Sequence, residues 1–313
     1  GRTGQAFKMP ADIKDVEKRT WEKLYQTGKE GRRTGLGFTA LADTLASLGL
    51  KYDSDKSLLV IEKIMRTKCE AEWESSIDMS IERGIFNGFD QNIEETSDFI
   101  KMLKVEFTEI YKRNMNYGRR NISISTCAPT GSVSIETQTS SGIEPVYQTN
   151  YTRFRKINPS DKNNKIHHYD EKGDAWQEYV LYHPKLKMWM DITGEKDLMK
   201  SPYWKSTAFD VNLEKRIEIQ SIIGKYTTHS LSSTINLPYE TTKDSISDIY
   251  LSAYNTKLKG ITIFREGSRD GILVSKFTTS QLFGCLNEIF LACKKTLGKI
   301  SLSFLEVFLR ANK

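Results

Sequence analysis

The chain has 313 residues, of which 27% are charged and 38% hydrophobic, and its formal net charge is +6. This composition excludes a largely disordered chain and is sufficient for one or two globular domains with sizeable cores. No apolar run approaches the roughly 20 residues that cross a membrane, and the first residues show no secretory pattern. Four cysteines without paired spacing are typical of a reducing compartment, so we expect a cytoplasmic protein with no membrane partner.

Hydrophobic periodicity predicts helices that alternate with short strands along the chain. The first half is predicted to contain helices at residues 38–49, 54–83 (with Ser54 as N-cap) and 96–115, then a strand at 121–126. The second half is predicted to contain a polar surface loop at 155–175, a helix that carries Trp176, Tyr179 and Leu181 and ends near His183-Pro184, helices at 210–226 and 242–258, and strands at 231–237 and 261–264. Such alternation favours parallel βαβ units, although three clear strands are too few to close a barrel.

Basic residues concentrate in three short segments, namely Lys29–Arg33, Arg119-Arg120 and Arg153–Lys156. We interpret them as solvated faces combined with anion binding, because no basic patch is interleaved with aromatic residues as in nucleic-acid modules. No nucleic-acid partner is therefore expected.

The segment from Ser125 to Glu136 is the most informative part of the chain. A predicted strand ends there in a loop with Pro129 and Gly131, and Thr130 and Ser132 supply hydroxyl groups. If a helix begins near Val133, its first backbone N–H groups and its dipole would favour an anion such as phosphate. From these residues alone an ordinary turn is the commoner alternative.

A family resemblance strengthens the phosphate interpretation. The run Ala128–Ser134, followed by Ser140–Pro145 and Tyr151–Arg153, resembles the substrate-phosphate segment of the catalytic subunit of ribonucleotide reductase, closest to its adenosylcobalamin-dependent form. Further similar blocks stand in the family's order and extend the resemblance over roughly residues 15 to 275, namely Gly31–Asp43, Tyr52–Ser54, His229-Ser230, Thr234–Pro238 and Lys259–Asp270.

The resemblance implies an α/β fold that holds the C-terminal part of a ten-stranded α/β barrel, and therefore an incomplete barrel. It divides the chain into a partial barrel domain, 1–275, and a divergent apolar helical tail, 276–313. The phosphate-binding residues that it implies are Ala128, Pro129, Thr130, Gly131, Ser132, Val133 and Ser134. A possible substrate-pocket loop comprises Gly142, Ile143, Glu144 and Pro145, although a turn role for Glu144 and Pro145 is equally plausible.

Reductases of this family use a thiyl-radical cysteine, assisting Asn and Glu side chains, and two reducing cysteines, all of which precede the Gly31–Asp43 block in family order. No cysteine stands before that block here, so no catalytic residue is assigned and the chain alone is expected to be inactive. The four histidines show no metal-ligand spacing, so no metal ligand is assigned either. The complete enzyme would need a ribonucleotide substrate, adenosylcobalamin, a thiol reductant such as thioredoxin or glutaredoxin, and an N-terminal half that is a separate chain or a lost segment. Ile263-Phe264 replaces the tyrosine pair of the oxygen-dependent form. The alternative is an inactive, truncated remnant that at most binds nucleotide.

Two other patterns are interpreted as structural. Gly35-Leu-Gly-Phe-Thr-Ala40 fits a dinucleotide-binding fingerprint, but no buried strand precedes it, so this reading is rejected. Cys127 is expected in the core, because a free buried cysteine behaves as a small hydrophobic residue. Cys285 and Cys293 would lie about 12 Å apart along a helix, too far for a disulfide, which disfavours a redox tail.

Overall fold

The computed structural model describes residues 11–157, 165–169 and 173–268 of the chain. Contacts divide the chain into a first unit, residues 1–149 and 182–270, and a second unit, residues 150–181 and 271–313. The expected apolar tail, 276–313, lies outside the described residues. No helix in the described ranges is long and apolar enough to cross a membrane.

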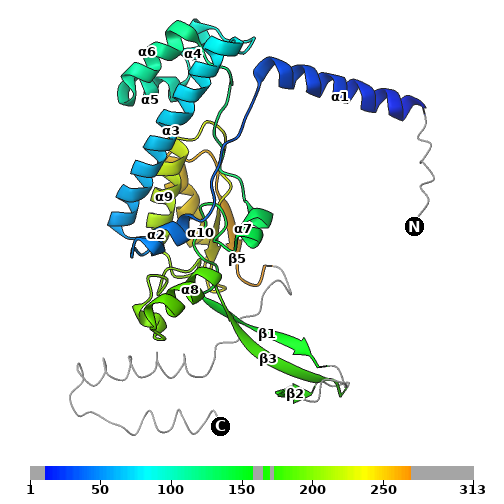
Figure 1. Cartoon of the computed structure of the whole chain (residues 1–313), viewed down its shortest axis with the longest axis vertical. Coiled ribbons are helices and arrows are strands. Elements are labelled where there is room, and N and C mark those ends of the chain that lie inside the picture. The colour runs from blue at the N-terminus through cyan, green and yellow to red at the C-terminus, as the bar shows by residue number, and fades with distance from the viewer. Residues whose placement is uncertain (1–10, 158–164, 170–172, 269–313) are drawn as a thin grey trace. The chain divides into compact units, whose positions relative to one another are not determined.

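The first unit is mainly helical (Figure 1). Its helices are α1 (Ala11–Gly31), α2 (Leu41–Ser47), α3 (Asp55–Arg83), α4 (Gln91–Glu94), α5 (Asp98–Glu106), α6 (Thr108–Tyr117), α7 (Gly131–Thr137), α8 (Pro184–Thr193), α9 (Leu213–Lys225) and α10 (Lys243–Asn255), with a 3₁₀ turn at Leu198–Lys200. Its strands are β4 (Thr234–Leu237) and β5 (Thr262–Arg265).

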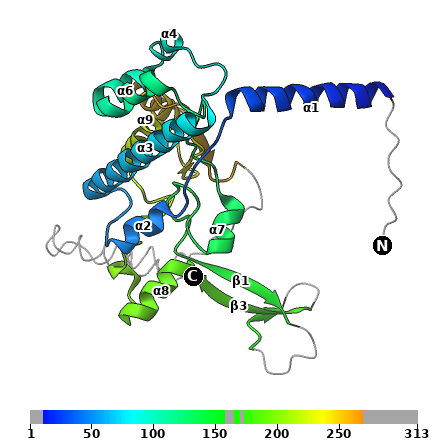
Figure 2. The same cartoon turned by 45° about the horizontal axis from the view of Figure 1, so that its top comes forward.

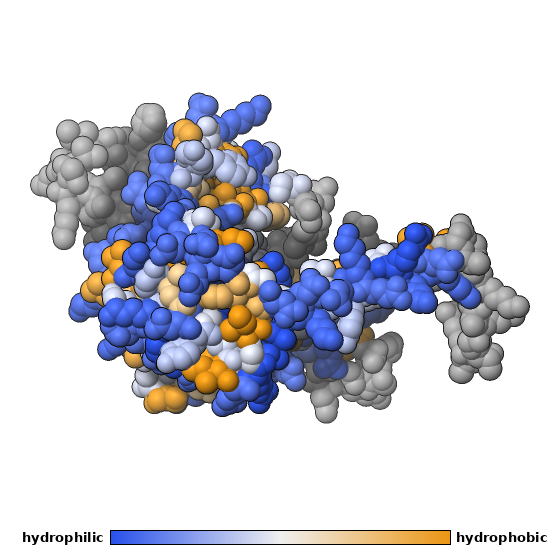
Figure 3. All heavy atoms as spheres, turned by 90° about the horizontal axis from the view of Figure 1, so that it is seen from above, coloured by the Kyte–Doolittle hydropathy of each residue, from blue (hydrophilic) through white to orange (hydrophobic). Residues whose placement is uncertain are grey.

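Helix α1 was not predicted from the sequence. It is exposed along its length and carries exposed apolar side chains, including Trp21 and Tyr25 at 63% and 71% exposure. On the face of the molecule that Figure 3 displays, hydrophilic residues dominate and hydrophobic residues form scattered patches.

Helix α3 organises the main core. Ser54 caps it as predicted, since its side chain accepts a hydrogen bond from the Ser57 N–H at 3.2 Å. Its buried apolar stripe has a spacing of four residues and packs toward α6 and α9; the stripe consists of Ile61, Met65, Cys69, Trp73 and Ile77. Each such side chain contributes about 1.5–3 kcal/mol through burial, so this stripe anchors α3 in the core.

The single helix predicted for residues 96–115 is two helices in the structure. Phe107 interrupts it with φ −136° and ψ 57°, and its ring is buried at 8% exposure. Arg66 lies 4.8 Å from the centre of that ring. Burial of the Phe107 ring and its contact with Arg66 therefore accompany a break that helical periodicity does not reveal.

Strands β4 and β5 confirm the predicted parallel βαβ unit. They pair in parallel from Thr234↔Thr262 to Leu237↔Arg265, and α10 connects them. A small second core is formed on this unit by Ile217, Ile235, Leu237 and Ile249.

The predicted strand at 121–126 is an extended segment with isolated parallel bridges rather than a regular strand. Leu36 bridges to Ser125, and Cys127 bridges to Leu231. The fold is thus mixed α/β, and no closed barrel is formed by the residues that the structure describes.

The second unit corrects two predictions. The expected helix around Trp176 is the strand β3 (Ala175–Tyr182), and the expected loop at 155–175 includes the end of β1 (Asn150–Lys156) and the short β2 (His168–Tyr169). The three strands form one sheet in the order β1-β3-β2, with His168 opposite Trp176. Aromatic and β-branched residues in β3 favour a strand, and the helical spacing of its apolar residues was misleading.

Candidate phosphate-binding loop

The extended segment 121–127 lies between two parallel neighbours. The Leu36 N–H donates to the Ile124 carbonyl at 2.8 Å on one side. On the other side the N–H groups of His229 and Ser232 donate to the carbonyls of Ser125 and Cys127 at 3.0 and 2.9 Å. The loop that follows Cys127 therefore leaves from the carboxyl end of a parallel arrangement, the end at which α/β proteins bind ligands.

The glycines of the rejected dinucleotide fingerprint have a packing role. A Cβ atom on Gly35 would lie 2.9 Å from Thr126 Cγ2, and one on Gly37 would lie 3.1 Å from the Thr126 carbonyl oxygen. Both glycines allow the segment around residue 36 to approach the central segment closely. This contact, and not a nucleotide, accounts for the spacing of the two glycines.

Helix α7 begins directly in the predicted loop, at Gly131, two residues earlier than expected (Figure 2). Thr130 precedes it in the left-handed region with φ 53° and ψ 26°, and makes no side-chain cap. The first N–H groups of a helix have no acceptor within the helix. Gly131, Ser132 and Val133 are exposed, so the N–H groups of this first turn belong to solvent-facing residues. The remaining loop residues divide between exposed Ala128 and Pro129 and buried Ser134.

The Thr130 hydroxyl group takes part in internal hydrogen bonds. It accepts from the Gly142 N–H at 2.7 Å and lies 3.0 Å from the Thr39 hydroxyl and 3.4 Å from the Ser141 hydroxyl. Of the two hydroxyl groups singled out in the sequence, only that of Ser132 belongs to an exposed residue.

The second predicted segment, residues 142–145, packs directly against the first. Gly142 has φ +51°, and a Cβ atom there would lie 3.0 Å from the Ala128 carbonyl oxygen. The Ser141 hydroxyl donates to the Pro129 carbonyl. The structure thus brings residues 128–134 and 142–145 into contact.

Glu144 forms an ion pair with a buried arginine. Its carboxylate accepts from Arg216, which is only 3% exposed, and from the Thr234 N–H at 2.9 Å. Arg216 also donates to the Ile143 carbonyl at 3.0 Å and to the hydroxyl groups of Tyr52 and Ser233. Burial raises the pKa of Tyr52, so this phenol stays protonated. Glu144 therefore holds the pocket loop to α9 and to the start of β4.

Asp43 holds the other end of the same loop. Its carboxylate accepts from the Ser140 N–H at 2.6 Å, from the Tyr203 hydroxyl at 2.8 Å, and contacts His183 Nε2 at 2.8 Å. Burial raises the pKa of Asp43, but the hydrogen bonds and charge of His183, together with Ser140 and Tyr203, outweigh burial and lower it overall. The loop at 140–145 is thus fixed at one end by the buried carboxylate of Asp43 and at the other by the half-buried carboxylate of Glu144.

These anchoring residues were not identified as site residues from the sequence. Asp43 and Tyr52 stand inside blocks that carry the family resemblance, and that position was the available signal. Arg216, His183 and Tyr203 had none, because their partners lie 72 to 160 residues away along the chain.

The two described cysteines lie in the core, as expected for Cys127. Cys69 and Cys127 are 1% and 3% exposed, and burial raises their thiol pKa values to about 12 and about 11. Neither is a reactive thiol in this structure.

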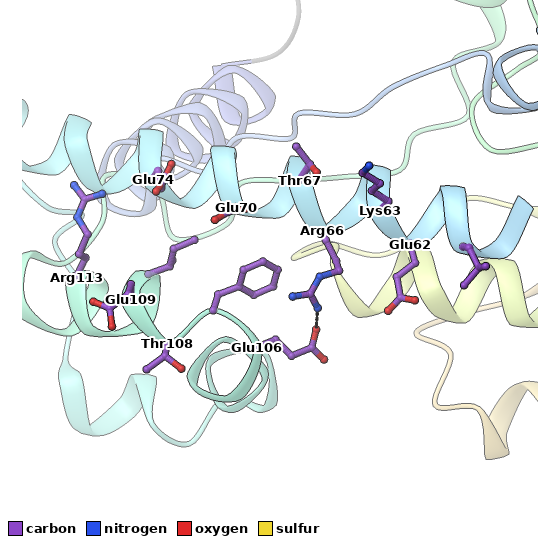
Figure 4. Close-up of a pocket in the computed structure, with 13 residues that line it drawn as sticks. Glu62, Lys63, Arg66, Thr67, Glu70, Glu74, Glu106, Thr108, Glu109 and Arg113 are labelled. Atoms are coloured by element: carbon purple, nitrogen blue, oxygen red, sulfur yellow. Dashed lines mark hydrogen bonds and ion pairs between the residues drawn. The ribbon is translucent and has the colours of Figure 1, made fainter. Parts of the chain in front are cut away.

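A separate groove of about 540 Å³ lies between α3 and the α5–α6 region (Figure 4). Its wall is mostly charged, and Arg66 pairs there with Glu106. The lining includes no residue of the 128–134 loop, so this groove is distinct from the candidate site.

Comparison with known proteins identifies the family. Residues 3–264 match the family model described as ribonucleotide reductase, barrel domain. The vitamin B12-dependent ribonucleoside-diphosphate reductase of Mycobacterium tuberculosis is 28% identical over 283 residues, which cover 87% of this chain and 37% of the relative. A protein of the same name from Thermoplasma acidophilum is 27% identical over 269 residues, covering 82% of this chain and 31% of the relative. The chain thus spans about a third of the length of the curated relatives it matches.

Proposed function

Because the chain belongs to the ribonucleotide reductase barrel-domain family, we propose that it is part of a vitamin B12-dependent reductase that converts ribonucleotides to deoxyribonucleotides in the cytoplasm. In this proposal it contributes the C-terminal part of a ten-stranded barrel and binds the substrate phosphates. The radical cysteine and the reducing cysteines belong to an N-terminal half of the enzyme. Thioredoxin or glutaredoxin is the proposed reductant.

The observation that carries the proposal is the exposed first turn of α7 at the carboxyl end of parallel segments. The N–H groups of Gly131, Ser132 and Val133 would bind phosphate oxygens, and the Ser132 hydroxyl would add a side-chain donor. The positive end of the helix dipole supports the same anion. Thr130 acts indirectly, because its hydroxyl group accepts from Gly142 and holds the two loops together.

Phosphate binding would contribute to the reaction by orientation. A nucleotide fixed by its phosphates presents its ribose to the reacting groups in one position. Such fixation lowers the activation barrier, because translational and rotational freedom is already lost on binding. The hydrogen bonds and ion pairs of Asp43 and Glu144 keep the loop in place before substrate arrives.

Adenosylcobalamin is the proposed cofactor of the complete enzyme, to which it supplies radical-generating chemistry when bound. Neither cysteine in the described part of the chain fits the role of the reacting thiol, because Cys69 and Cys127 are both buried. No reaction step is therefore assigned to residues of this chain.

The proposal is tested by measuring ribonucleotide reduction with adenosylcobalamin and a dithiol, for this chain alone and co-expressed with the N-terminal half of a related reductase. Activity only in the co-expressed sample supports the proposal. A soluble complex without activity favours the second candidate, a remnant that binds nucleotide but does not support reduction.

Backbone and hydroxyl contributions to binding can be separated by two variants of one residue. Ser132→Ala removes the hydroxyl group, whereas Ser132→Pro also removes a backbone N–H in the first turn of α7, where that N–H has no acceptor within the helix. We expect titration calorimetry to show weaker ribonucleoside diphosphate binding for Ser132→Pro than for Ser132→Ala. Equal affinity of both variants and the unmodified chain would contradict the assigned site.

A further inference from the structure

Two of the basic segments noted in the sequence converge at the end of α3. Arg32 Nη1 donates to the Ile85 carbonyl at 2.6 Å, and Arg120 Nη1 donates to the Gly84 carbonyl at 3.0 Å and to the Arg83 carbonyl. The C-terminal end of α1 lies beside the end of α3 in both ribbon views (Figures 1 and 2), and the Asn87 N–H donates to the Glu30 carbonyl at 3.1 Å. Arginines from three separate segments therefore share one small region.

These arginines are not neutralised by carboxylates in the described ranges. Arg32 and Arg120 have no ion pair there, and Arg83 has only Glu82 at 3.9 Å, with both side chains about two-thirds exposed. Loss of hydration and the positive charges of Arg32 and Arg83 lower the pKa of Arg120. The hydrogen bonds to the carbonyl groups of residues 83–85 hold these like charges close together.

The neighbouring Arg119, in contrast, is neutralised by a carboxylate. It is 5% exposed, pairs with Glu94, and lies 4.8 Å from the Trp73 ring. Arg119 stabilises the core. Arg120 points instead to the carbonyl groups at the end of α3.

Part of the arrangement is explained by the helix, since guanidinium groups stabilise the negative C-terminal end of α3. That role uses Nη1 of Arg32 and of Arg120. Each guanidinium has five N–H donors, so further donors on each group can bind a ligand.

We propose that Arg32, Arg83 and Arg120 form a second anion site, which binds the di- or triphosphate group of a small molecule. Two cations without carboxylate partners in the described ranges, and a third with one long, exposed contact to Glu82, offer up to three positive charges to a ligand. A carboxylate supplies one negative charge, whereas a di- or triphosphate supplies three or four in a compact group, and guanidinium groups bind phosphate oxygens in pairs.

This site is separate from the α7 loop and goes beyond the proposed function. Arg120 immediately precedes the extended segment 121–127, and the α7 loop follows it. Seven residues at roughly 3.3 Å each separate the two sites by up to about 23 Å. The two sites can therefore be tested independently.

The test is titration of the full chain with inorganic tripolyphosphate and with pyrophosphate, at fixed ionic strength. Arg83→Gln is the main variant, because this exposed side chain has a single long contact and its loss leaves the carbonyl groups of α3 capped. Arg19→Gln on α1 is the matched control, since it removes one exposed arginine charge elsewhere.

We expect two classes of tripolyphosphate site in the unmodified chain. Arg83→Gln should weaken one class about tenfold and leave the other unchanged, and Ser132→Pro should do the reverse. Arg19→Gln should change neither class. Arg120→Lys, which keeps the charge but loses the planar donor set, should also weaken the Arg83-sensitive class.

Several results would overturn the second site while leaving the proposed function intact. One such result is a single class of site that only Ser132→Pro abolishes, and another is an equal effect of Arg83→Gln and Arg19→Gln on tripolyphosphate binding. A third is binding of a glutamate-rich peptide at concentrations too low for tripolyphosphate to bind. If the unmodified chain has only the Arg83-sensitive class and no class that depends on Ser132, the proposed function is contradicted instead.

Discussion

Replacing Arg216 by Met tests whether the ion pair between Arg216 and Glu144 fixes the pocket loop. Arg216 is 3% exposed and donates to Glu144, Tyr52, Ser233 and the Ile143 carbonyl. Removing one partner of a buried pair costs about 3–5 kcal/mol, because the other charge is left without compensation. Here the Glu144 side chain is 27% exposed and keeps the Thr234 N–H as a donor. We therefore expect the lower end, about 3 kcal/mol, for Arg216→Met.

The matched control is the preceding residue on the same helix. Lys215 pairs with Asp55 at 2.8 Å and Glu218 at 3.0 Å, but these carboxylates are largely exposed. Exposed ion pairs contribute less than about 1 kcal/mol, so Lys215→Met should be nearly neutral.

The assay is urea unfolding of the two variants and the unmodified chain, with the free energy of unfolding extrapolated to water. Glu144→Gln should cost less than Arg216→Met, because the amide still accepts a hydrogen bond. The double variant should cost less than the sum of the single ones, since each change removes the same interaction. A cost below about 1 kcal/mol for Arg216→Met, or full additivity, would refute the claim that this pair holds the loop.

Three further outcomes are expected. Gly142→Ala should destabilise the chain by about 1–3 kcal/mol in the same assay and weaken nucleotide binding, because φ is positive there and the added Cβ meets a loop carbonyl; an unchanged stability would contradict this. The pKa of Asp43 is lower in the folded chain than in the unfolded chain. Its carboxylate therefore stabilises the fold fully above the pKa of the unfolded chain, and this stabilisation is lost as the pH falls through the pKa of the folded chain. The stability difference between the unmodified chain and Asp43→Asn should therefore shrink between pH 5 and pH 2, and a difference that grows on acidification would exclude this role. Cys69 and Cys127 should be alkylated only after unfolding, as peptide mapping by mass spectrometry would show, and rapid labelling of the folded chain would contradict their burial.

Features encoded over short stretches were predictable from the sequence. The Ser54 cap and the four-residue stripe of α3 are local signals, and both are present in the structure. The helix after Pro129 was also expected, since a Pro-Thr-Gly-Ser loop ends one element and permits another to start.

Features set by packing were not predictable in this way. The break at Phe107 accompanies the burial of that ring and its contact with Arg66, which is 41 residues earlier. The helix expected around Trp176 became a strand because its neighbours in the sheet override a short periodic signal.

The candidate site shows the same division. Its loop could be located from Pro129, Gly131 and the family resemblance. The supporting contacts could not, because Asp43 and Glu144 acquire their partners only when distant segments fold together. The internal role of the Thr130 hydroxyl group likewise depends on Gly142 from the second loop.

The most direct test of the central claim is an NMR titration that follows the backbone amide signals of the chain. Addition of a ribonucleoside diphosphate should shift the amide signals of Gly131, Ser132 and Val133, and the nucleoside without phosphates should not. Shifts of these three signals that saturate with the diphosphate alone are the result that the phosphate-loop account predicts. Unchanged signals at Gly131 to Val133 under saturating diphosphate, or equal shifts with the nucleoside, would contradict it.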